Sequence, residues 1–248
     1  MERDPATTLD GGQPSAPDPA EADRIRAVYR RYDTQEQWLR KRDPANPGFS
    51  RLQGERWRKI AEIIGTRPRA DAPPRVVDVG CGKGGDLANL ADLLPGAELF
   101  GVDLSEERVE AARLAVPAAT LRVHDGDTLP FPDRSVQLVL LSTVLSSILD
   151  PRARRRVATE AYRIVSDDGM LLIYDIRLPS PANPNVCRIG KGELRALLPA
   201  AHIRSYPITL LPPVARSLCR RWPGLYPPLA CVRPLRSHYL SVVTRSDP

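Results

Sequence analysis

The hydrophobic positions in the middle of the chain form short continuous runs, separated by segments with helical periodicity. The five runs are RVVDVG (75–80), ELFGVD (98–103), TLRVHDG (120–126), VQLVLLS (136–142) and MLLIYDI (170–176). The helical segments between them cover residues 84–94, 105–115 and 151–165. Continuous apolar runs between amphipathic helices are typical of parallel strands that helices cover on both faces. The pattern therefore predicts an α/β fold with a doubly wound, mostly parallel sheet.

The segment before this region is predicted to be helical. Apolar residues recur at helical spacing after Asp23, which is placed to act as an N-cap. The sequence PANPGF (44–49) interrupts the pattern, and RLQGERWRKIAEIIG (51–65) predicts a second helix that Gly65 ends. We expect residues 23–68 to form an N-terminal helical cap.

The pattern after Pro179 is less regular. A loop rich in Pro and Asn precedes a predicted helix at 190–198, a strand at 202–209, a proline-rich stretch at 212–234 and a final strand, SHYLSVVTR. The two strands bring the sheet to seven, with the proline-rich stretch as an insert before the last one. The chain therefore reads as one domain over residues 23–248, with a core at 70–178 and a further part at 179–248.

Composition limits the class of protein. The first 22 residues have almost no large apolar side chain, and we expect them to form a disordered tail. The chain has no stretch of about 18 apolar residues and no basic start before an apolar segment, so we expect a soluble cytoplasmic protein without a membrane partner. Four cysteines without C-x-x-C spacing and three widely separated histidines predict reduced thiols and no metal site.

The net charge of +6 is unevenly distributed. Residues 24–69 hold thirteen basic and five acidic side chains, and residues 176–248 hold eleven basic and two acidic ones. The segment between them, residues 70–175, has seventeen acidic and eleven basic side chains. Basic clusters attract anions. The positions of these two segments in the fold therefore decide whether the positive charge favours an anionic ligand.

The segment VVDVGCGKGGDLANL (76–90) joins the first strand to a helix through Gly80, Gly82 and Gly84. Such a turn lets the backbone approach a ligand closely at the carboxyl end of a parallel sheet. The spacing is not the G-x-G-x-x-G of dinucleotide enzymes, and Lys83 is not followed by the Ser or Thr of a phosphate loop. The turn therefore predicts a ligand site that does not depend on phosphate, or else a tight turn without a ligand.

Acidic residues follow the next two strands. Asp103 ends the second strand about twenty residues after the glycine turn, where a carboxylate can accept both hydroxyl hydrogens of a ribose. Asp127 follows the third strand and could accept a hydrogen from an adenine amino group. Either acid alone is more often a cap or a solvated turn residue, and their joint occurrence favours a nucleoside ligand.

These motifs resemble a known family. VVDVGCGKGG, GVDLSEERVEAAR and DGDTLPFPDRSVQLV are similar to successive motifs of class I S-adenosylmethionine-dependent methyltransferases, over about residues 70–178. The resemblance implies a Rossmann-like fold and S-adenosylmethionine as the cofactor. The cofactor-binding residues that it implies are Asp78, Gly80, Cys81, Gly82 and Gly84 around the methionine part, Asp103 and Leu104 at the ribose, Asp127 and Thr128 at the adenine, and Ser142 with Thr143 beside the sulfonium.

The candidate catalytic residues are those expected near the transferred methyl group. Tyr174, Asp175 and Arg177 leave the fifth strand, and His238 could act as a base if the start of the last strand faces the site. Asp175 and Arg177 could equally form an ion pair that ties the loop to the sheet, and a histidine is more often a surface or core residue.

Two further groups admit two readings each. Tyr29, Tyr32 and Trp38 could close over the cofactor or pack against the sheet. Asn183 and Asn185 lie between prolines, which favours turn formation over a substrate role.

The acceptor is predicted only by class. SSILDPRARRRVATEAYRIVSDDG and ITLLPPVARSLCRRW resemble a bacterial subgroup associated with polysaccharide or secondary-metabolite biosynthesis, which implies a small-molecule acceptor. In this fold the two basic segments would meet at the substrate side, so we expect an anionic acceptor. One alternative is an RNA cap guanine methyltransferase, which GCGKGGDL also resembles, although 5% aromatic residues disfavour a nucleic-acid partner. Another is a non-catalytic scaffold.

Overall fold

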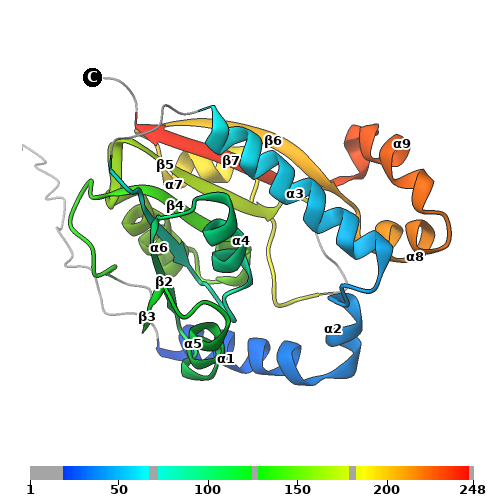
Figure 1. Ribbon diagram of the computed structural model, residues 1–248, viewed down its shortest axis with the longest axis horizontal. Coiled ribbons are helices and arrows are strands. Elements are labelled where there is room, and N and C mark those ends of the chain that lie inside the picture. The colour runs from blue at the N-terminus through cyan, green and yellow to red at the C-terminus, as the bar shows by residue number, and fades with distance from the viewer. Residues whose placement is uncertain (1–18, 67–71, 125–127, 179–182, 246–248) are drawn as a thin grey trace, which may run out of the picture.

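The computed structural model describes residues 19–66, 72–124, 128–178 and 183–245 (Figure 1). The helices are α1 (Pro19–Thr34), α2 (Glu36–Lys41), α3 (Pro47–Gly65), α4 (Gly85–Leu93), α5 (Glu106–Ala115), α6 (Pro151–Arg163), α7 (Lys191–Leu197), α8 (Pro212–Arg221) and α9 (Tyr226–Cys231). The strands are β1 (Arg75–Val79), β2 (Glu98–Asp103), β3 (Thr120–Val123), β4 (Val136–Ser142), β5 (Val165–Ile176), β6 (Ala201–Leu210) and β7 (Arg236–Arg245). Short 3-10 turns are η1 (Leu145–Ser147), η2 (Pro223–Leu225) and η3 (Arg233–Leu235).

The seven strands form one sheet in the order β3-β2-β1-β4-β5-β7-β6. Strands β1 to β5 pair in parallel, and β7 runs antiparallel to both β5 and β6. The direction of winding reverses between β1 and β4, which is where α/β sheets open a crevice at the carboxyl ends of their strands. The prediction of a doubly wound, mostly parallel, seven-stranded sheet is confirmed.

Each face of the sheet has its own apolar core. Val76 and Val77 are both fully buried, and they point to opposite faces because side chains alternate along a strand. Val76 belongs to the cluster that contains Ile60 of α3 and Leu87 of α4. Val77 belongs to the cluster that contains Val157 of α6. These two layers explain why the strands read as continuous apolar runs.

The α8–α9 lobe (residues 212–235) lies beyond one end of the sheet (Figure 1). A third apolar cluster joins it to α3 through Leu52, Ala215 and Tyr226. Helices α3 and α8 touch at Gly48, where an added Cβ would lie 1.8 Å from the carbonyl oxygen of Ala215. The proline-rich insert is therefore an ordered lobe fixed to the N-terminal cap.

The start of the first helix differs from the prediction. Helix α1 begins at Pro19, so Asp23 is not an N-cap but lies inside the helix, where it pairs with Arg26 at 2.7 Å. Residues 19–22 of the expected tail are helical, while residues 1–18 lie outside the described residues. Glu21 explains the difference, because its carboxylate accepts a hydrogen bond of 2.6 Å from the backbone N–H of Leu149 and thereby fixes this first turn to the body of the domain.

Other boundaries move by a few residues. The first predicted helix is divided at Gln35 into α1 and α2, and α3 begins at Pro47 because the side chain of Asn46 caps the N–H groups of Gly48 and Phe49. Strand β5 starts at Val165, five residues before the predicted run. It does so because Val165 already pairs with β4, and the preceding helix α6 consequently ends at Arg163.

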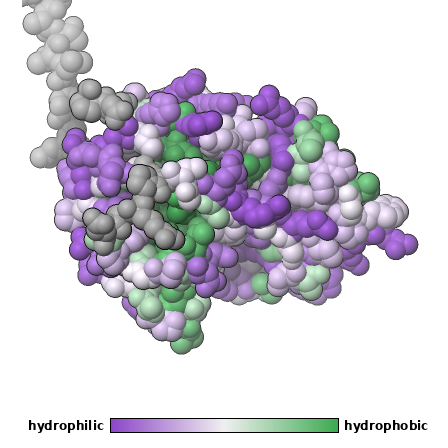
Figure 2. Space-filling view, turned by 45° about the horizontal axis from the view of Figure 1, so that its top comes forward, coloured by the Kyte–Doolittle hydropathy of each residue, from purple (hydrophilic) through white to green (hydrophobic). Residues whose placement is uncertain are grey.

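The surface is mostly hydrophilic. Figure 2 shows polar residues over most of one face, with hydrophobic residues in narrow bands between them. None of the helices in the described ranges is long and apolar enough to cross a membrane.

Candidate active site

The glycine turn after β1 has the geometry that its spacing predicts. Gly80, Gly82 and Gly84 all have positive φ, at 78°, 54° and 82°. The N–H groups of Gly80 and Cys81 both donate to the carbonyl oxygen of Val102 on β2, at 2.7 and 3.0 Å. Left-handed backbone of this kind favours glycine, so the turn can form here without side chains over it.

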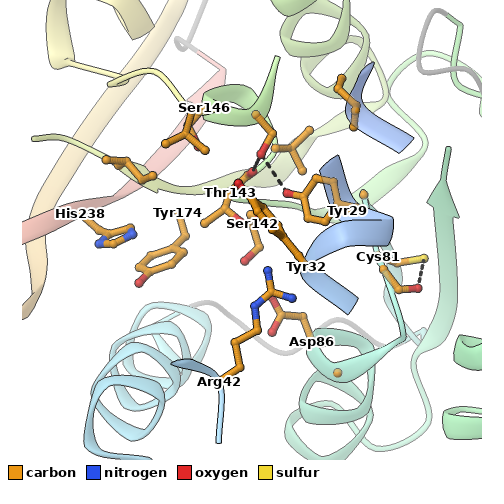
Figure 3. A pocket seen from close by; sticks show the side chains of 18 of the residues that line it. Tyr29, Tyr32, Arg42, Cys81, Asp86, Ser142, Thr143, Ser146, Tyr174 and His238 are labelled. Atoms are coloured by element: carbon orange, nitrogen blue, oxygen red, sulfur yellow. Dashed lines mark hydrogen bonds between the residues drawn. The ribbon is translucent and has the colours of Figure 1, made fainter. Parts of the chain in front are cut away.

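The turn opens into a large cavity of about 1130 Å³. Its floor is the carboxyl edge of β1, β2, β4 and β5, and its walls come from α1, α2, α3, α8 and the start of β7. Figure 3 shows aromatic and polar side chains converging on this space from elements far apart in the sequence. Two of the glycines, Gly80 and Gly82, line the cavity, together with Cys81.

Asp78 lies at the end of β1 beside the turn and is 1% exposed. It lines the cavity, and neither carboxylate oxygen has a hydrogen-bond partner among the described residues. Burial and the nearby Asp86 raise the pKa of Asp78 well above its ordinary value. A buried carboxylate without partners costs free energy, so this position fits a ligand that brings a hydrogen-bond donor or a positive charge.

Asp103 ends β2 and faces the same turn. One oxygen accepts from the N–H of Gly82 and the other from the N–H of Ser105, both at 2.9 Å. Each carboxylate oxygen has a second lone pair, so Asp103 can still accept two hydroxyl hydrogens. Arg108 lies close by, with Nη1 3.8 Å from Asp103 and its guanidinium 4.5 Å from the ring centroid of Tyr29.

A second ion pair lies further along the floor. Arg56 of α3 is 6% exposed, and its guanidinium donates to both oxygens of Asp86 and, at 2.8 Å, to the hydroxyl of Ser142. The guanidinium also lies 5.0 Å from the ring centroid of Tyr174. Arg56 therefore connects the glycine-turn helix α4 to the ends of β4 and β5.

Tyr174 and His238 meet across the antiparallel pair β5 and β7. Their rings lie next to each other in the cavity (Figure 3) and stack, with centroids 4.7 Å apart and planes 4° apart. Burial, together with the positive charge of Arg56, lowers the pKa of His238 to about 3, and burial raises the pKa of Tyr174 to about 12. Both rings line the cavity and are neutral at pH 7.

Hydrogen bonds fix the tautomer of His238. The hydroxyl of Ser237 donates to the carbonyl oxygen of Thr209 at 3.1 Å, and a carbonyl can only accept. Both contacts of this hydroxyl are hydrogen bonds at the same time only when Nδ1 of His238, 2.7 Å away, is the donor, so the arrangement favours the proton on Nδ1. A neutral imidazole with its proton on Nδ1 keeps the lone pair on Nε2, so the ring can accept a hydrogen bond from a ligand in the cavity.

The aromatic residues of the N-terminal cap form one wall of the cavity. Tyr29 is hydrogen-bonded to the hydroxyl of Ser147 at 2.8 Å, and Tyr32 donates to the side chain of Asn183 at 3.0 Å. Both tyrosines and Trp38 line the cavity. Tyr32 is also 5% exposed, so this group packs against the domain as well as bordering the cavity, and closure over the cofactor stays a prediction.

The turn reading of the asparagine pair is confirmed. The side-chain oxygen of Asn183 accepts from the backbone N–H of Asn185 at 3.2 Å, which is an Asx turn. Asn183 additionally lines the cavity through its contact with Tyr32.

Several residues implied by the sequence lie elsewhere. Asp175 and Arg177 do not line the cavity, which removes the geometric basis for a substrate contact in this arrangement. They are not an ion pair either, since Asp175 accepts from the N–H of Ser146 at 3.1 Å and Arg177 donates to the carbonyl oxygen of Arg233 at 3.2 Å. Alternation along β5 is the reason, because it turns Asp175 away from the face that Tyr174 occupies.

Of the remaining residues expected to bind the cofactor, some line the cavity and others do not. Leu104, Ser142 and Thr143 line the cavity, whereas Thr128 is exposed outside it and Asp127 lies outside the described residues. Gly84 does not line the cavity. An added Cβ there would lie 3.2 Å from Cα of Ala112, so this glycine permits α4 to pack against α5.

Sequence reasoning missed several residues that face the cavity. They are Arg56, Asp86, Arg108, His124 and Arg216. Asp86 carried a usable signal, because it lies two residues after Gly84 in the first turn of the predicted helix. The arginines carried none, since neighbouring arginines on the same helices point to solvent.

Parts of this chain are similar in sequence to known proteins. A family model described as a methyltransferase domain matches residues 76–169. Trans-aconitate 2-methyltransferase of Methylobacterium radiotolerans is 34% identical over 42% of this chain and 40% of its own length. Fatty-acid O-methyltransferase of Mycolicibacterium smegmatis is 37% identical over 42% of this chain and 37% of its own length. The chain thus spans less than half the length of these curated relatives.

Solved structures agree at the level of the fold. An S-adenosylmethionine-dependent methyltransferase from Mesorhizobium loti superposes with a TM-score of 0.55 and 18% identity over 77% of this chain and 99% of that one. Phosphoethanolamine N-methyltransferase 1 of Haemonchus contortus gives a TM-score of 0.62 with 14% identity over 93% of this chain and 50% of that one. Residues 76–169 thus match a methyltransferase domain, and the whole sheet has the fold of a solved S-adenosylmethionine-dependent methyltransferase.

Proposed function

We propose that the protein transfers a methyl group from S-adenosylmethionine to a small acidic molecule, in a bacterial biosynthetic pathway. The observation that carries this proposal is the unpartnered carboxylate of Asp78 beside the glycine turn, inside a cavity of about 1130 Å³. A pocket for one ligand typically measures about 300–1,000 Å³. The cavity therefore has room for a cofactor at the turn and an acceptor beyond it.

The residues at the turn fit the cofactor. Asp78 would receive its ammonium group and Asp103 its ribose hydroxyls, with Gly80 and Gly82 lining the cavity between them. When bound, the cofactor supplies an electrophilic methyl group on a sulfonium. This chain supplies the alignment of the acceptor with that methyl group. In the best intramolecular models such alignment lowers the barrier by about 7–11 kcal/mol.

His238 is proposed to orient the nucleophile of the acceptor. Its Nε2 lone pair is available because Ser237 and Thr209 hold the proton on Nδ1. A pKa of about 3 makes this imidazole a weak base, so its suitable role is to accept a hydrogen bond from a hydroxyl or amine without taking the proton completely. Tyr174 stacks on the ring and keeps it in this orientation.

Two observations support an acidic acceptor. The two basic segments of the sequence, which include α2 and α8, border the same cavity. Two relatives are named for acids, trans-aconitate and a fatty acid. An apparent Michaelis constant that rises with ionic strength is expected for an anionic acceptor, and one that does not change with salt would contradict it.

The proposal is tested in two steps. Calorimetry with S-adenosylhomocysteine is expected to show binding, and no heat at millimolar ligand would favour the scaffold alternative. Transfer of a labelled methyl group is then measured with a panel of small carboxylic acids and phosphate esters, with capped RNA as the comparison. Methylation of capped RNA in preference to all small acids would favour the cap alternative instead.

A further inference from the structure

The charges around the cavity are distributed unequally between its two ends. The acids near the glycine turn are Asp78, Asp86 and Asp103, and the cations among them are Arg56, Lys83 and Arg108, so that charges of both signs balance there. A chain of contacts leads away from the turn along the cavity. Arg56 contacts Ser142 and Tyr174. Tyr174 is in turn hydrogen-bonded to Thr209 at 2.9 Å. Thr209 leads directly into Leu211 and α8, which therefore form the far end.

The far end is cationic. It carries Lys41 of α2 and Arg216 of α8, and neither has an acidic partner within ion-pair distance among the described residues. Arg42, which follows α2, lies 3.7 Å from Asp33, and the same carboxylate lies 3.6 and 3.2 Å from Lys83 and Arg108 at the glycine-turn end. Lys41 and Arg216 thus leave an excess of positive charge among the described residues that line the far end of the cavity.

Arg216 has no acidic partner within ion-pair distance among the described residues, and its guanidinium donates no hydrogen bond to any of them. Other arginines that are removed from solvent are paired: Arg56 with Asp86, Arg154 with Glu193, and Arg236 with Glu55. Burial lowers the pKa of Arg216, although an arginine stays protonated at neutral pH. Arg216 is only partly removed from solvent, so its unpaired charge faces the cavity and can be met by the counter-charge of a ligand.

The surroundings of Arg216 define what kind of anion fits. Pro212, Pro213 and Ser217 lie on the same stripe of α8 and line the cavity with it. Phe49 and Leu52 of α3 line the cavity at the same end. The space between His238 and Arg216 is thus bordered mainly by apolar groups, and the guanidinium of Arg216 lies at its far end.

We propose that Arg216 is the binding residue for the anionic group of an amphipathic acceptor, a carboxylate or phosphate ester whose apolar part lies along α3 and α8. This inference rests on the proposed function and deepens it. The anion is bound at the end opposite the glycine turn, so the atom that receives the methyl group is a different one, near His238. The anionic group consequently persists in the product.

The experiment uses the full chain saturated with S-adenosylhomocysteine. Calorimetry measures the binding of dodecanoate and dodecyl phosphate against dodecanol and methyl dodecanoate, which have the same chain without the charge. The wild type is expected to bind at least one of the two anions at least tenfold more tightly than the neutral compounds. The preferred anion identifies the carboxylate or the phosphate as the class.

Two positions on α8 distinguish a specific anion-binding residue from a general effect of net charge. Arg216→Gln is expected to remove the preference for the anion, and Arg216→Lys to retain part of it. Arg220→Gln, one turn further along α8 and exposed, is the matched control with the same change in net charge, and it is expected to bind like the wild type. All variants are expected to bind S-adenosylhomocysteine with unchanged affinity, because Arg216 lies away from the glycine turn.

Three outcomes would overturn the inference while leaving the proposed function intact, provided that S-adenosylhomocysteine still binds. They are equal binding of charged and neutral compounds by the wild type, no binding of any of them at millimolar concentration, and equal losses in Arg216→Gln and Arg220→Gln. Loss of S-adenosylhomocysteine binding by the wild type would instead contradict the proposed function. Formation of labelled methyl dodecanoate from dodecanoate would also overturn the inference, because the anion would then be the group that is methylated.

Discussion

The imidazole of His238 lies parallel to the phenol ring of Tyr174, with centroids 4.7 Å apart and planes 4° apart. The pairing of Asp175 with Tyr239 and of Ile176 with His238 across β5 and β7 sets this relationship. Ser237, the next residue on β7, reaches back to Thr209 on β6 and so controls which nitrogen of the ring carries the proton. Three strands are therefore needed to present one neutral nitrogen to the cavity.

The ionisation of His238 is expected to make stability depend on pH. Its pKa in the folded protein is about 3, below the ordinary value of 6.5, so the unfolded chain binds the proton first as the pH falls. The contribution of this histidine to the free energy of unfolding is present above pH 6.5 and is lost progressively between pH 6.5 and 3, by up to about 1.4 kcal/mol per pH unit.

Urea denaturation at pH 7, 6 and 5 measures this effect, with His238→Asn as the comparison. The wild type is expected to lose more stability than the variant over this range. Asp175 acts in the opposite direction, because burial raises its pKa to about 6 and its neutral form favours the folded state at low pH. Since both proteins contain Asp175, its effect cancels in the comparison, and parallel curves would show that His238 is protonated in the folded protein.

Asp103→Ala is expected to weaken the binding of S-adenosylhomocysteine by about 1–3 kcal/mol, because charge-assisted hydrogen bonds to the ribose are lost. Calorimetry measures the affinity, and circular dichroism checks that the fold is retained. Asp92→Ala is the control, since Asp92 is exposed on α4 and does not line the cavity. Unchanged affinity in Asp103→Ala would place the ribose elsewhere.

Asp78→Asn is expected to separate stability from binding. The buried carboxyl has no partner in the described residues and its pKa is raised, so an uncharged amide of the same shape should leave the unfolding midpoint at pH 7 unchanged or higher. Affinity for S-adenosylhomocysteine should fall at least tenfold, since the ammonium group loses its counter-charge. A variant that loses stability but keeps its affinity would show that Asp78 serves the fold and not the cofactor.

Local spacing was enough to predict part of this site. The glycine turn, Asp103 and the parallel strands follow from residues close together in sequence, and the structure retains them. The start of α1 was missed because Glu21 is held by Leu149, a contact across 128 residues. A sequence pattern carries no signal for such a contact.

The arginines show the same limit more clearly. The chain contains 36 Lys and Arg residues, and their spacing does not distinguish Arg56 or Arg216 from exposed neighbours such as Arg220. What distinguishes them is how α3 and α8 cross the sheet and each other. Arg154 shows the same limit, because Arg152 and Arg155 beside it are exposed, whereas Arg154 is 8% exposed and paired with Glu193.

The crossing of α3 and α8 gives a stability prediction with an internal control. An added Cβ at Gly48 would lie 1.8 Å from the carbonyl oxygen of Ala215, and helix backbone cannot move aside as a flexible side chain can. Gly48→Ala is therefore expected to destabilise the protein by more than about 2 kcal/mol by separating the two helices. Gly54 lies on the same helix with no atom within 4 Å of an added Cβ, so Gly54→Ala should stabilise by about 0.5–1 kcal/mol through helix propensity. Urea denaturation of both variants measures the difference.

Because α8 also carries Arg216, the folded fraction of Gly48→Ala should bind dodecyl anions less well than Gly54→Ala does. Equal binding by the two variants would show that the position of α8 does not matter for the cavity.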